Sequence, residues 1–445
     1  MVKRSMSERA FPRPGAGLSF KAAEGAGGPV IPFKAVKRQN ILIVSSLFPP
    51  HVFGGAEVAA YNRAKLLTQR GHNVSVMTLY ERNLPAAWGD LSPEGFRIYR
   101  VETPRGYTLF ERTQIKSRFS KIFWHFQDYF DARNKELMNA VLDHSRPDHV
   151  EIDNIMGIGF NALQEIGRRN IPAAYILHDL NLACINTGMI KKGKQCKRQC
   201  VSCRGIAVLR QRNLERIRNL GFISPSRANL ERAKKVISRV AASPVCVNRN
   251  VPEELPLLPE RKCAGHIRLL FAGRLHPDKG IGFLLRTLDD LSDIYDFHLT
   301  ILGKGPSEWP LKVRYGKKKW VTFRGFVPEE EVVKIIAASD LCCIPSLVSE
   351  SYGLVTAHAL RLGTPVIGSN AGGTAELVRD GVTGILPPPG DMQAWKEAFL
   401  KIFSDRKLLA EWRENAAGFS SEFNKDAIGK AHEAFIESLA FKSYQ

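Results

Sequence analysis

The stretch NILIVSSLFPPHVFGGAEVAAYNRAKLLTQRGHNVSVMTL, residues 40–79, decides the fold class. Its first part, up to Pro50, is a short apolar run that two prolines end, which is typical of a strand buried on both faces. Residues 54–72 then carry apolar side chains at helical spacing before a Gly-His stop, and residues 73–79 have the pattern of a strand again. This βαβ unit predicts a parallel sheet with helices on its faces.

The same alternation of strands and helices runs along most of the chain. A stretch with several prolines and charges at 253–265 interrupts it, and the alternation restarts at residue 266. We therefore predict an α/β protein with two Rossmann-like doubly wound domains that face a cleft. The expected parts are a disordered basic tail (1–37), an N-terminal domain (38–252), a linker (253–265), a C-terminal domain (266–425) and a C-terminal helix (426–445) that packs back on the first domain.

The composition is that of a globular protein with excess positive charge. The chain has 445 residues, 44% of them hydrophobic and 9% aromatic, which is enough to fill two cores. Lys and Arg outnumber Asp and Glu by 64 to 44, for a formal net charge of +20, and ten of these cations lie in residues 191–220. Such a surface attracts nucleic acid, anionic lipid or a phosphorylated substrate, or it is a solvated basic face without a dedicated partner.

The location of the protein is predicted from what the sequence lacks. No run approaches the length of a membrane-spanning helix. The basic N-terminus has no apolar block followed by a cleavage site, so we expect a reducing cytoplasmic compartment.

Two motifs at strand-to-helix junctions carry the predicted chemistry. In FAGRLHPDKGI, Arg274 and Lys279 flank a turn after a buried strand, where two cations can clamp a diphosphate. In IPSLVSESYGLVTAHAL, Glu350 precedes Gly353 and the start of a helix, whose free N–H groups favour an anion. A glycine turn, SNAGGTAELV, follows at Gly372 and Gly373. A basic solvated loop and a helix-capping carboxylate are the alternative interpretations of the two motifs.

Together with FPPHVFGGAEVAAYNRAKLL, HDL, PSR, ILGKGP, TFRGFVP and GTPVIGSNAGGTAELVRDGVTGILPPPGD, these motifs make the sequence resemble the GT-B glycosyltransferases. The likeness is to the large retaining family, family 4 (group 1), and covers roughly residues 38–425. It implies an enzyme of the hexosyltransferase type that uses a nucleotide sugar, UDP- or GDP-linked, without an essential metal. The acceptor implied is a glycan or a lipid-linked molecule of cell-surface polysaccharide or lipopolysaccharide biosynthesis.

The resemblance also implies roles for particular residues. Its catalytic set is His178, Asp179 and Glu350, with Asp179 orienting His178. Its donor-binding set is Gly54, Gly55, Arg274, Lys279, Gly353, Leu354 and His358. Fixed cations beside the leaving phosphate lower the barrier to glycosyl transfer, and the leaving phosphate oxygen is a plausible base for the acceptor hydroxyl.

His358 departs from the family pattern. The family carries a second glutamate eight residues after the first, and it grips the ribose hydroxyls; here that position is a histidine. A neutral imidazole accepts from only one hydroxyl, so the identity of the nucleotide stays open. The alternative is a helix histidine that faces the cleft with no ligand.

Four cysteines, Cys184, Cys196, Cys200 and Cys203, follow His178 closely. In a reducing compartment this spacing favours a structural tetrahedral zinc site over disulfides, and an iron–sulfur cluster uses the same ligands. Some members of the resembled family carry a similar cluster at this place. The alternative is four unrelated thiols in a loop.

Residues 105–133, RGYTLFERTQIKSRFSKIFWHFQDYFDAR, mix cations with aromatic side chains at partly helical spacing. This composition suits peripheral association with an anionic membrane, and we expect contact with the inner face of the cell membrane. Core packing of Phe119, Phe123, Phe126 and Phe130 explains the pattern nearly as well.

Three classes of function are therefore compared. The leading hypothesis is a retaining glycosyltransferase, and the first alternative is a catalytically weak partner protein that binds a nucleotide sugar or a glycan. The second alternative, a zinc-bearing nucleic-acid binder, is favoured by the charge and the cysteines, but no recognised nucleic-acid fold accompanies them.

Overall fold

The structure is a computed structural model that describes residues 37–52, 54–80, 87–102, 118–191, 194–254 and 265–441. From Arg38 onward the chain forms one compact unit, and two large sheets lie within it. The predicted basic tail lies outside the described residues except for Lys37. Most of the predicted linker and residues 105–117 of the aromatic segment lie outside them as well.

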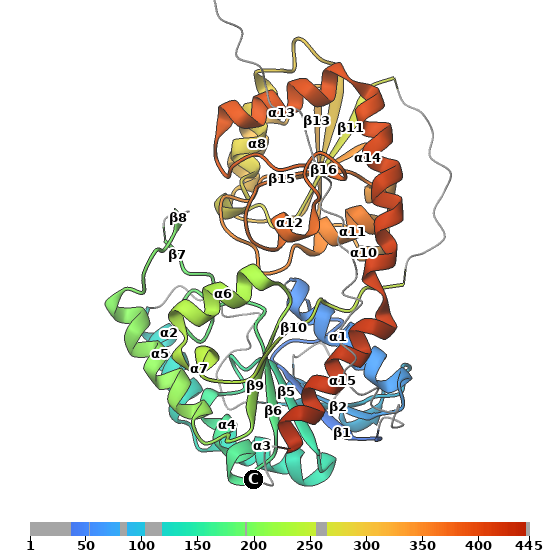
Figure 1. The fold of residues 1–445 in the computed structure, drawn as a ribbon. Helices are drawn as coiled ribbons and strands as arrows, with labels where there is room; N and C mark the ends of the chain where they lie inside the picture. The colour runs from blue at the N-terminus through green and yellow to red at the C-terminus, as the bar shows by residue number, and fades with distance from the viewer. Residues whose placement is uncertain are drawn as a thin grey trace, which may run out of the picture. The chain divides into compact units, whose positions relative to one another are not determined.

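The first sheet contains eight strands in the order β10-β9-β6-β5-β1-β2-β4-β3 (Figure 1). All neighbours are parallel except β3 and β4. Five of the six residues in β1 are fully buried, as expected for a strand covered on both faces. The strands are β1 (Asn40–Ser45), β2 (Asn73–Leu79), β3 (Trp88–Leu91), β4 (Arg97–Val101), β5 (His149–Asn154), β6 (Ala173–Ile176), β9 (Leu220–Ser224) and β10 (Val245–Val247).

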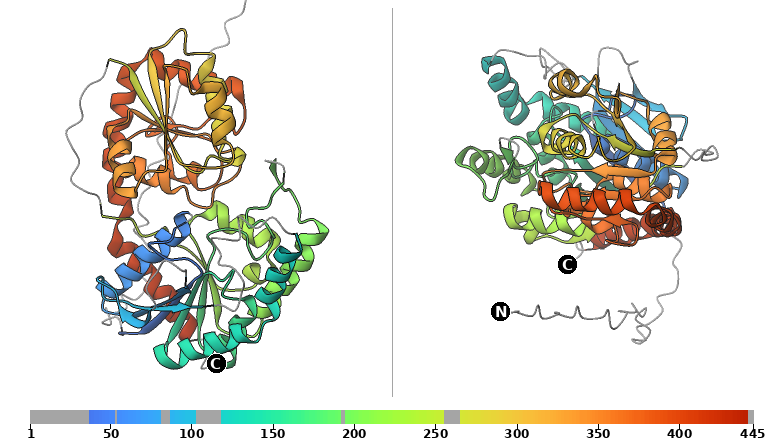
Figure 2. Two further views of the ribbon diagram at one scale, coloured as in Figure 1. Left: turned by 180° about the vertical axis from the view of Figure 1, so that it is seen from behind. Right: turned by 90° about the horizontal axis from the view of Figure 1, so that it is seen from above.

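Helices cover both faces of this sheet (Figure 2). The last helix, α15 (Lys425–Phe441), contacts α1 and β6, so the end of the described chain packs on the first sheet. A small hairpin forms from β7 (Ile190–Lys191) and β8 (Lys194–Gln195). The other helical segments are α1 (Gly55–Gln69), α2 (Arg118–Phe130), α3 (Arg133–Ser145), η2 (Phe160–Ala162), α4 (Leu163–Arg168), α5 (Val201–Leu214), α6 (Arg227–Val236) and α7 (Ser238–Ala241).

The second sheet has six parallel strands in the order β13-β12-β11-β14-β15-β16. They are β11 (Ile267–Ala272), β12 (Phe297–Leu302), β13 (Val321–Gly325), β14 (Leu341–Ile344), β15 (Val366–Gly368) and β16 (Gly384–Ile385). Its helical segments are η3 (Pro277–Lys279), α8 (Ile281–Asp289), α9 (Glu308–Tyr315), α10 (Glu329–Ala338), α11 (Leu354–Arg361), α12 (Gly372–Leu377), α13 (Met392–Ser404), α14 (Arg406–Gly418) and η4 (Phe419–Phe423).

The fold class predicted from the sequence is confirmed, since both sheets are doubly wound. In the first sheet the strand order reverses between β1 and β5, and in the second it reverses between β11 and β14. Ligands of open α/β sheets bind outside the carboxyl ends of the strands at such reversals. The connections that follow β1, β5, β11 and β14 are therefore the place to look for a site.

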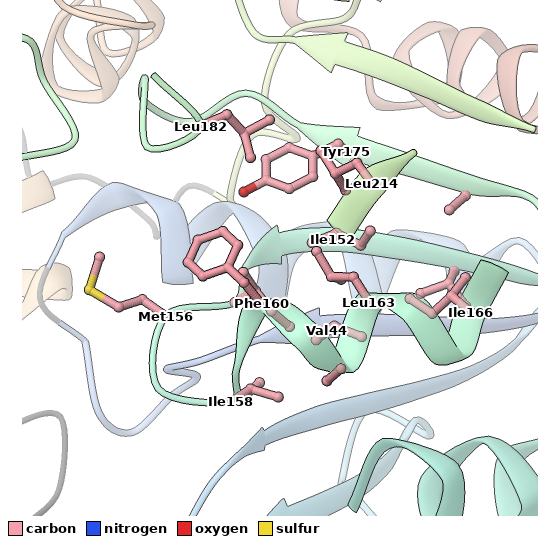
Figure 3. Packing of buried hydrophobic residues seen from close by; sticks show 14 of the residues in the cluster. Val44, Ile152, Met156, Ile158, Phe160, Leu163, Ile166, Tyr175, Leu182 and Leu214 are labelled. Carbon is pink, nitrogen blue, oxygen red and sulfur yellow. The ribbon is translucent and has the colours of Figure 1, made fainter. Parts of the chain in front are cut away.

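The core of the first sheet is built from large apolar side chains between β5, β6 and the helical segments η2 and α4. Tyr175, Phe160 and Ile152 pack together there (Figure 3), and each is at most 1% exposed. Burying a side chain of this size contributes about 1.5 to 3 kcal/mol. This packing fixes the ends of β5 and β6, from which functional side chains project.

In the second sheet, Gly280 allows two loops to approach closely. Its φ is +70°, and a Cβ added there would lie 1.8 Å from the carbonyl oxygen of Pro345, which follows β14. Only glycine fits both the backbone conformation and the space. The close approach brings the turn after β11 next to the turn after β14.

We predict that Gly280→Ala lowers the free energy of unfolding by roughly 2 to 3 kcal/mol, because it adds a steric clash to an unfavourable φ. Gly381→Ala is the matched control, because Gly381 has a φ of +74° with no atom within 4 Å of the added Cβ. Gly381→Ala is expected to lower the free energy of unfolding by only about 1 kcal/mol. Urea unfolding of both variants measures the difference, and equal losses would show that the approach to Pro345 is unimportant.

Candidate functional site

His178 lies just beyond the carboxyl end of β6, and its partner is a carboxylate from the neighbouring strand. The ring Nε2 hydrogen-bonds to Oδ1 of Asp153 at 2.5 Å. The two side chains are 9% and 0% exposed. A buried carboxylate on one ring nitrogen fixes both the tautomer and the orientation of the imidazole.

Asp179, which sequence analysis paired with His178, makes a different hydrogen bond. Its Oδ1 accepts from the backbone N–H of Asn181 at 2.8 Å. Burial raises the pKa of Asp179, against the opposing effects of that hydrogen bond and of the charges on His178 and Arg210. Asp179 therefore shapes the loop after β6, while Asp153 holds the histidine.

A chain of buried charged groups extends from Asp153 to the C-terminal helix. Arg63 of α1 bonds to Asp153 and, through Nε, to Glu151 at 2.5 Å. Oε1 of Glu151 in turn forms a hydrogen bond, 2.5 Å long, with Nε2 of His432, which belongs to α15. Burial opposes ionisation of both Arg63 and Glu151, but their partners outweigh it, so the pKa of Arg63 is raised and that of Glu151 is lowered. The network joins α1, β5, β6 and α15.

The start of α1 adds a further carboxylate beside His178. Glu57 accepts a hydrogen bond from the backbone N–H of Gly54 at 2.9 Å, which caps the helix. Burial raises the pKa of Glu57, and His178 and Asp153 are close enough to affect it. A Cβ on Gly55 would lie 2.0 Å from Cδ1 of Leu354, so the glycine lets α1 meet the first residue of α11.

In the second sheet, Lys279 and Glu350 form an ion pair. Lys279 Nζ donates to Glu350 Oε1 at 2.8 Å, and the Ser346 hydroxyl donates to the same oxygen. Burial alone would raise the pKa of Glu350, but Lys279, Ser346 and the charge of Arg274 lower it. The two cations and the carboxylate that the sequence singled out thus lie in one place.

The N-terminus of α11 lies beside Lys279 and Glu350. The residue before the helix has a left-handed backbone conformation, which glycine adopts readily. Gly353 precedes the helix with a φ of +92°. Behind it, a Cβ on Gly373 would lie 2.0 Å from the carbonyl oxygen of Tyr352, and the Gly373 N–H donates to the Glu350 carbonyl at 2.9 Å. The free N–H groups of α11 and the nearby cations favour an anion.

Segments of the first sheet contact the loop that carries Glu350. The Ser226 hydroxyl donates to the Ser351 carbonyl at 2.6 Å, and Arg232 Nη1 donates to the Ser349 carbonyl at 3.0 Å. The Ser349 N–H donates to Oε1 of Gln195, in the small hairpin, at 3.4 Å. The conformation of the Glu350 loop therefore depends on both sheets.

His358 is buried in α11 beside two glutamates rather than pointing into open space. It is 9% exposed, and burial lowers its pKa against the attraction of Glu253. Ligand atoms of His358, Glu253 and Glu329 lie within 4.8 Å of one another.

The four cysteines are only partly gathered. The sulfurs of Cys184 and Cys203 lie 3.5 Å apart. Cys203 lowers the pKa of the exposed Cys200 by hydrogen bonding, while burial raises that of Cys203 to about 11. Within the described ranges, no three cysteine sulfurs approach one another as closely as metal ligands must. Zinc or an iron–sulfur cluster bound by these cysteines and Cys196 stays a prediction.

Helix α2 presents aromatic side chains on its surface. Phe123, Phe126 and Phe130 are 63%, 57% and 54% exposed, so core packing does not explain them. Trp124 and Tyr129 are the buried aromatics of this helix. Beside it on α5, Arg210 hydrogen-bonds through Nε to the Tyr129 hydroxyl at 2.8 Å.

Sequence reasoning missed Glu57, Arg63, Glu151, Asp153 and His432. A signal existed for two of them: HVEIDNI places acids at 151 and 153, on the same face of a buried strand. Acids in such a strand need buried partners. Which cations supplied them depended on packing between distant segments.

The fold of this chain is that of the GT-B glycosyltransferases. Residues 261–419 match the family described as "Glycosyl transferases group 1", so the resemblance found in the sequence is confirmed for this part of the chain.

Known proteins show the same likeness. The chain is 32% identical to the phosphatidyl-myo-inositol mannosyltransferase of Mycobacterium leprae over 33% of its own length and 40% of that protein's. Sucrose-phosphate synthase from Thermosynechococcus elongatus has a similar fold, with a TM-score of 0.70 and 20% identity over 90% of this chain and 99% of that one. HepE of Anabaena, solved in complex with UDP, has a TM-score of 0.62 and 18% identity over 89% and 99% of the two chains.

His149 gives a prediction about acid stability. It is 2% exposed, and neither ring nitrogen has a hydrogen-bond partner among the described residues. Burial lowers its pKa from 6.5 to about 4. The folded state therefore binds fewer protons than the unfolded state, and stability falls as the pH drops from 6.5 towards 4, by about 3 kcal/mol in all.

We expect His149→Leu to remove this part of the pH dependence, measured as the melting temperature between pH 7 and pH 4. His144→Leu, at an exposed position of α3, should leave the slope as it is. An unchanged slope in His149→Leu would mean that other groups cause the loss of stability in acid.

Proposed function

We propose that the chain is a retaining glycosyltransferase that moves a sugar from a UDP- or GDP-linked donor to a glycan or lipid-linked acceptor. The pathway proposed is the biosynthesis of cell-surface polysaccharide or lipopolysaccharide. The chain spans about 40% of the length of the mannosyltransferase that it matches, so this activity rests on the site itself.

The observation that carries the proposal is the cluster of Arg274, Lys279 and Glu350 at the N-terminus of α11. It unites two cations, an ionised carboxylate and free helix N–H groups at a reversal of the strand order. A nucleoside diphosphate has the charge and size to satisfy the cations and the helix terminus together. The UDP bound by HepE, whose fold is similar, supports this ligand class.

The leaving diphosphate gains negative charge as the glycosidic bond breaks. Arg274 and Lys279 compensate this charge, aided by the N–H groups of Gly353 and Leu354. When the diphosphate draws Lys279 away, Glu350 is free to accept from a hydroxyl of the donor sugar. Gly55 lets the start of α1 contact Leu354, so the N-termini of α1 and α11 lie next to each other at the proposed donor site.

His178 acts from the first sheet. Asp153 occupies Nε2 of the ring, so Nδ1 is the nitrogen left to contact a substrate hydroxyl. Transfer with retention then needs no carboxylate nucleophile, because a phosphate oxygen of the leaving group takes the proton of the acceptor hydroxyl. His178 and Asp153 orient the sugar for this step.

We also propose that α2 holds the protein on the anionic inner face of the cell membrane. Phe123, Phe126 and Phe130 recur at helical spacing on its exposed surface. Phe130 lines the same hollow as the cations Lys135 and Arg212. Apolar side chains flanked by cations bind the interface of anionic bilayers. None of the helices in the described ranges is long and apolar enough to cross a membrane.

Two further proposals remain from the sequence. The second candidate function is a partner protein that binds a nucleotide sugar or a glycan without efficient catalysis. It is favoured because His358 stands where the resembled family has a ribose-binding carboxylate. A structural zinc at the cysteines would stabilise the loop between His178 and α5.

Thermal stabilisation tests the donor site. We predict that one family of nucleoside diphosphates raises the melting temperature by a few degrees, since a ligand at one hundred times its Kd adds about 2.7 kcal/mol. Arg274→Ala should abolish the shift, because it removes a cation from the diphosphate site. Lys317→Ala, an exposed cation elsewhere in the second sheet, is the control.

The same assay separates the two candidates when it is combined with a measurement of sugar transfer. Binding without transfer to any glycan or lipid acceptor would favour the partner protein. If no nucleotide raises the melting temperature, both candidate functions are contradicted.

Sedimentation with vesicles tests the membrane proposal. We expect wild-type protein to bind vesicles that contain anionic phosphatidylglycerol, and Phe126→Ser to bind at least about fivefold more weakly because it loses about 1.5 to 3 kcal/mol of apolar burial. Val313→Ser, on α9, changes a side chain of similar exposure (65%) and should bind like wild type. Equal binding by both variants would exclude α2 as the contact.

A further inference from the structure

His358, Glu253 and Glu329, here called the carboxylate–imidazole cluster, come from three separate parts of the chain. Each contributes one ligand atom, and these atoms lie within 4.8 Å of one another. His358 is in the middle of α11, Glu329 is the first residue of α10, and Glu253 follows β10. Within the described ranges this is the one group of three or more His, Cys, Asp or Glu side chains with such spacing.

The histidine is the unusual member. It is more than nine-tenths buried, yet its ring makes no hydrogen bond with any described residue. A buried polar group without a partner is costly, so such groups normally have one. Imidazole nitrogens are common ligands of divalent cations.

Glu253 has contacts with α1 and α11, and the charge of Arg361 attracts its carboxylate. Asn62 Nδ2 donates to Glu253 Oε1 at 3.3 Å, while Arg361 Nη2 donates to the backbone carbonyl of Glu253 at 2.6 Å. A carboxyl oxygen of Glu253 and one of Glu329 lie within 4.8 Å of each other, so the two groups repel when both are ionised. A cation between them removes that repulsion.

We propose that Glu253, Glu329 and His358 bind a divalent first-row transition-metal cation. Two carboxylate oxygens and one imidazole nitrogen are a common ligand set for Zn²⁺, Mn²⁺ and related ions, with water completing the coordination. The position of Glu329 on the surface gives the ion a route in.

The ion has a structural task at this place. Asn62 of α1 donates both to Glu253 and, at 3.4 Å, to the Val251 carbonyl, so the segment after β10 is anchored to the first sheet. The metal anchors the same segment to α10 and α11 of the second sheet. It thereby strengthens the connection between the two sheets.

Mn²⁺ is the best probe, because carboxylates suit it whereas thiolates such as those of the cysteine cluster select softer ions. The full-length protein, without nucleotide, is titrated with Mn²⁺, and free Mn²⁺ is followed by electron paramagnetic resonance. The variants are His358→Gln and Glu329→Gln, with Glu330→Gln, the next residue of α10, as the matched control. Circular dichroism without metal confirms that each variant is folded.

Wild type and Glu330→Gln are expected to bind one equivalent of Mn²⁺ with the same affinity. Glu329→Gln and His358→Gln should bind at least about tenfold more weakly, since each removes a direct ligand. Should His358→Gln fail to fold, the surface variant Glu329→Gln decides the question alone. Absence of binding at millimolar Mn²⁺, or equal binding by Glu329→Gln and wild type, overturns the proposal.

Discussion

Arg63 is the residue on which the first half of the site depends, because it compensates two buried carboxylates at once. Glu151 and Asp153 are 0% and 2% exposed, and both bond to its guanidinium. Removing one partner of a buried ion pair typically costs 3 to 5 kcal/mol, because the remaining charge is left without compensation. Since Asp153 also holds His178 and Glu151 holds His432, a change at Arg63 disturbs a catalytic candidate and the docking of α15 together.

The second half of the site is assembled mainly by backbone contacts. Gly280 and Gly373 let carbonyl groups approach where any side chain would collide. The turns after β11 and β14 therefore lie close enough for Lys279 to reach Glu350. The backbone around Lys279, Glu350 and the N-terminus of α11 is therefore fixed by steric contacts.

The sequence predicted the sheets, and it singled out Lys279 and Glu350, which the structure brings into contact, because both depend on local patterns. The strand from residue 40 and the turns around Lys279 and Glu350 carry their signals within a few residues. The partner of His178 could not be found in that way, since Asp153 is 25 positions away and reaches it only across two paired strands. Asp179, next in the sequence, was preferred for its proximity, but its side chain is turned to the backbone of Asn181. The exposure of Phe126 could not be predicted from the sequence either, because an amphipathic pattern does not say which aromatic face the core covers.

The bond between His432 and Glu151 has a consequence for the newly made chain. The two residues are 281 positions apart. At about 5 to 20 residues per second, translation separates their appearance by roughly 15 to 55 seconds. During that interval the first sheet has most of its strands but lacks α15, and Glu151 is without its bond to His432. The nascent first half is thus left partly exposed on the ribosome, at the stage when chaperones act, until residues 425–441 have emerged and packed against it.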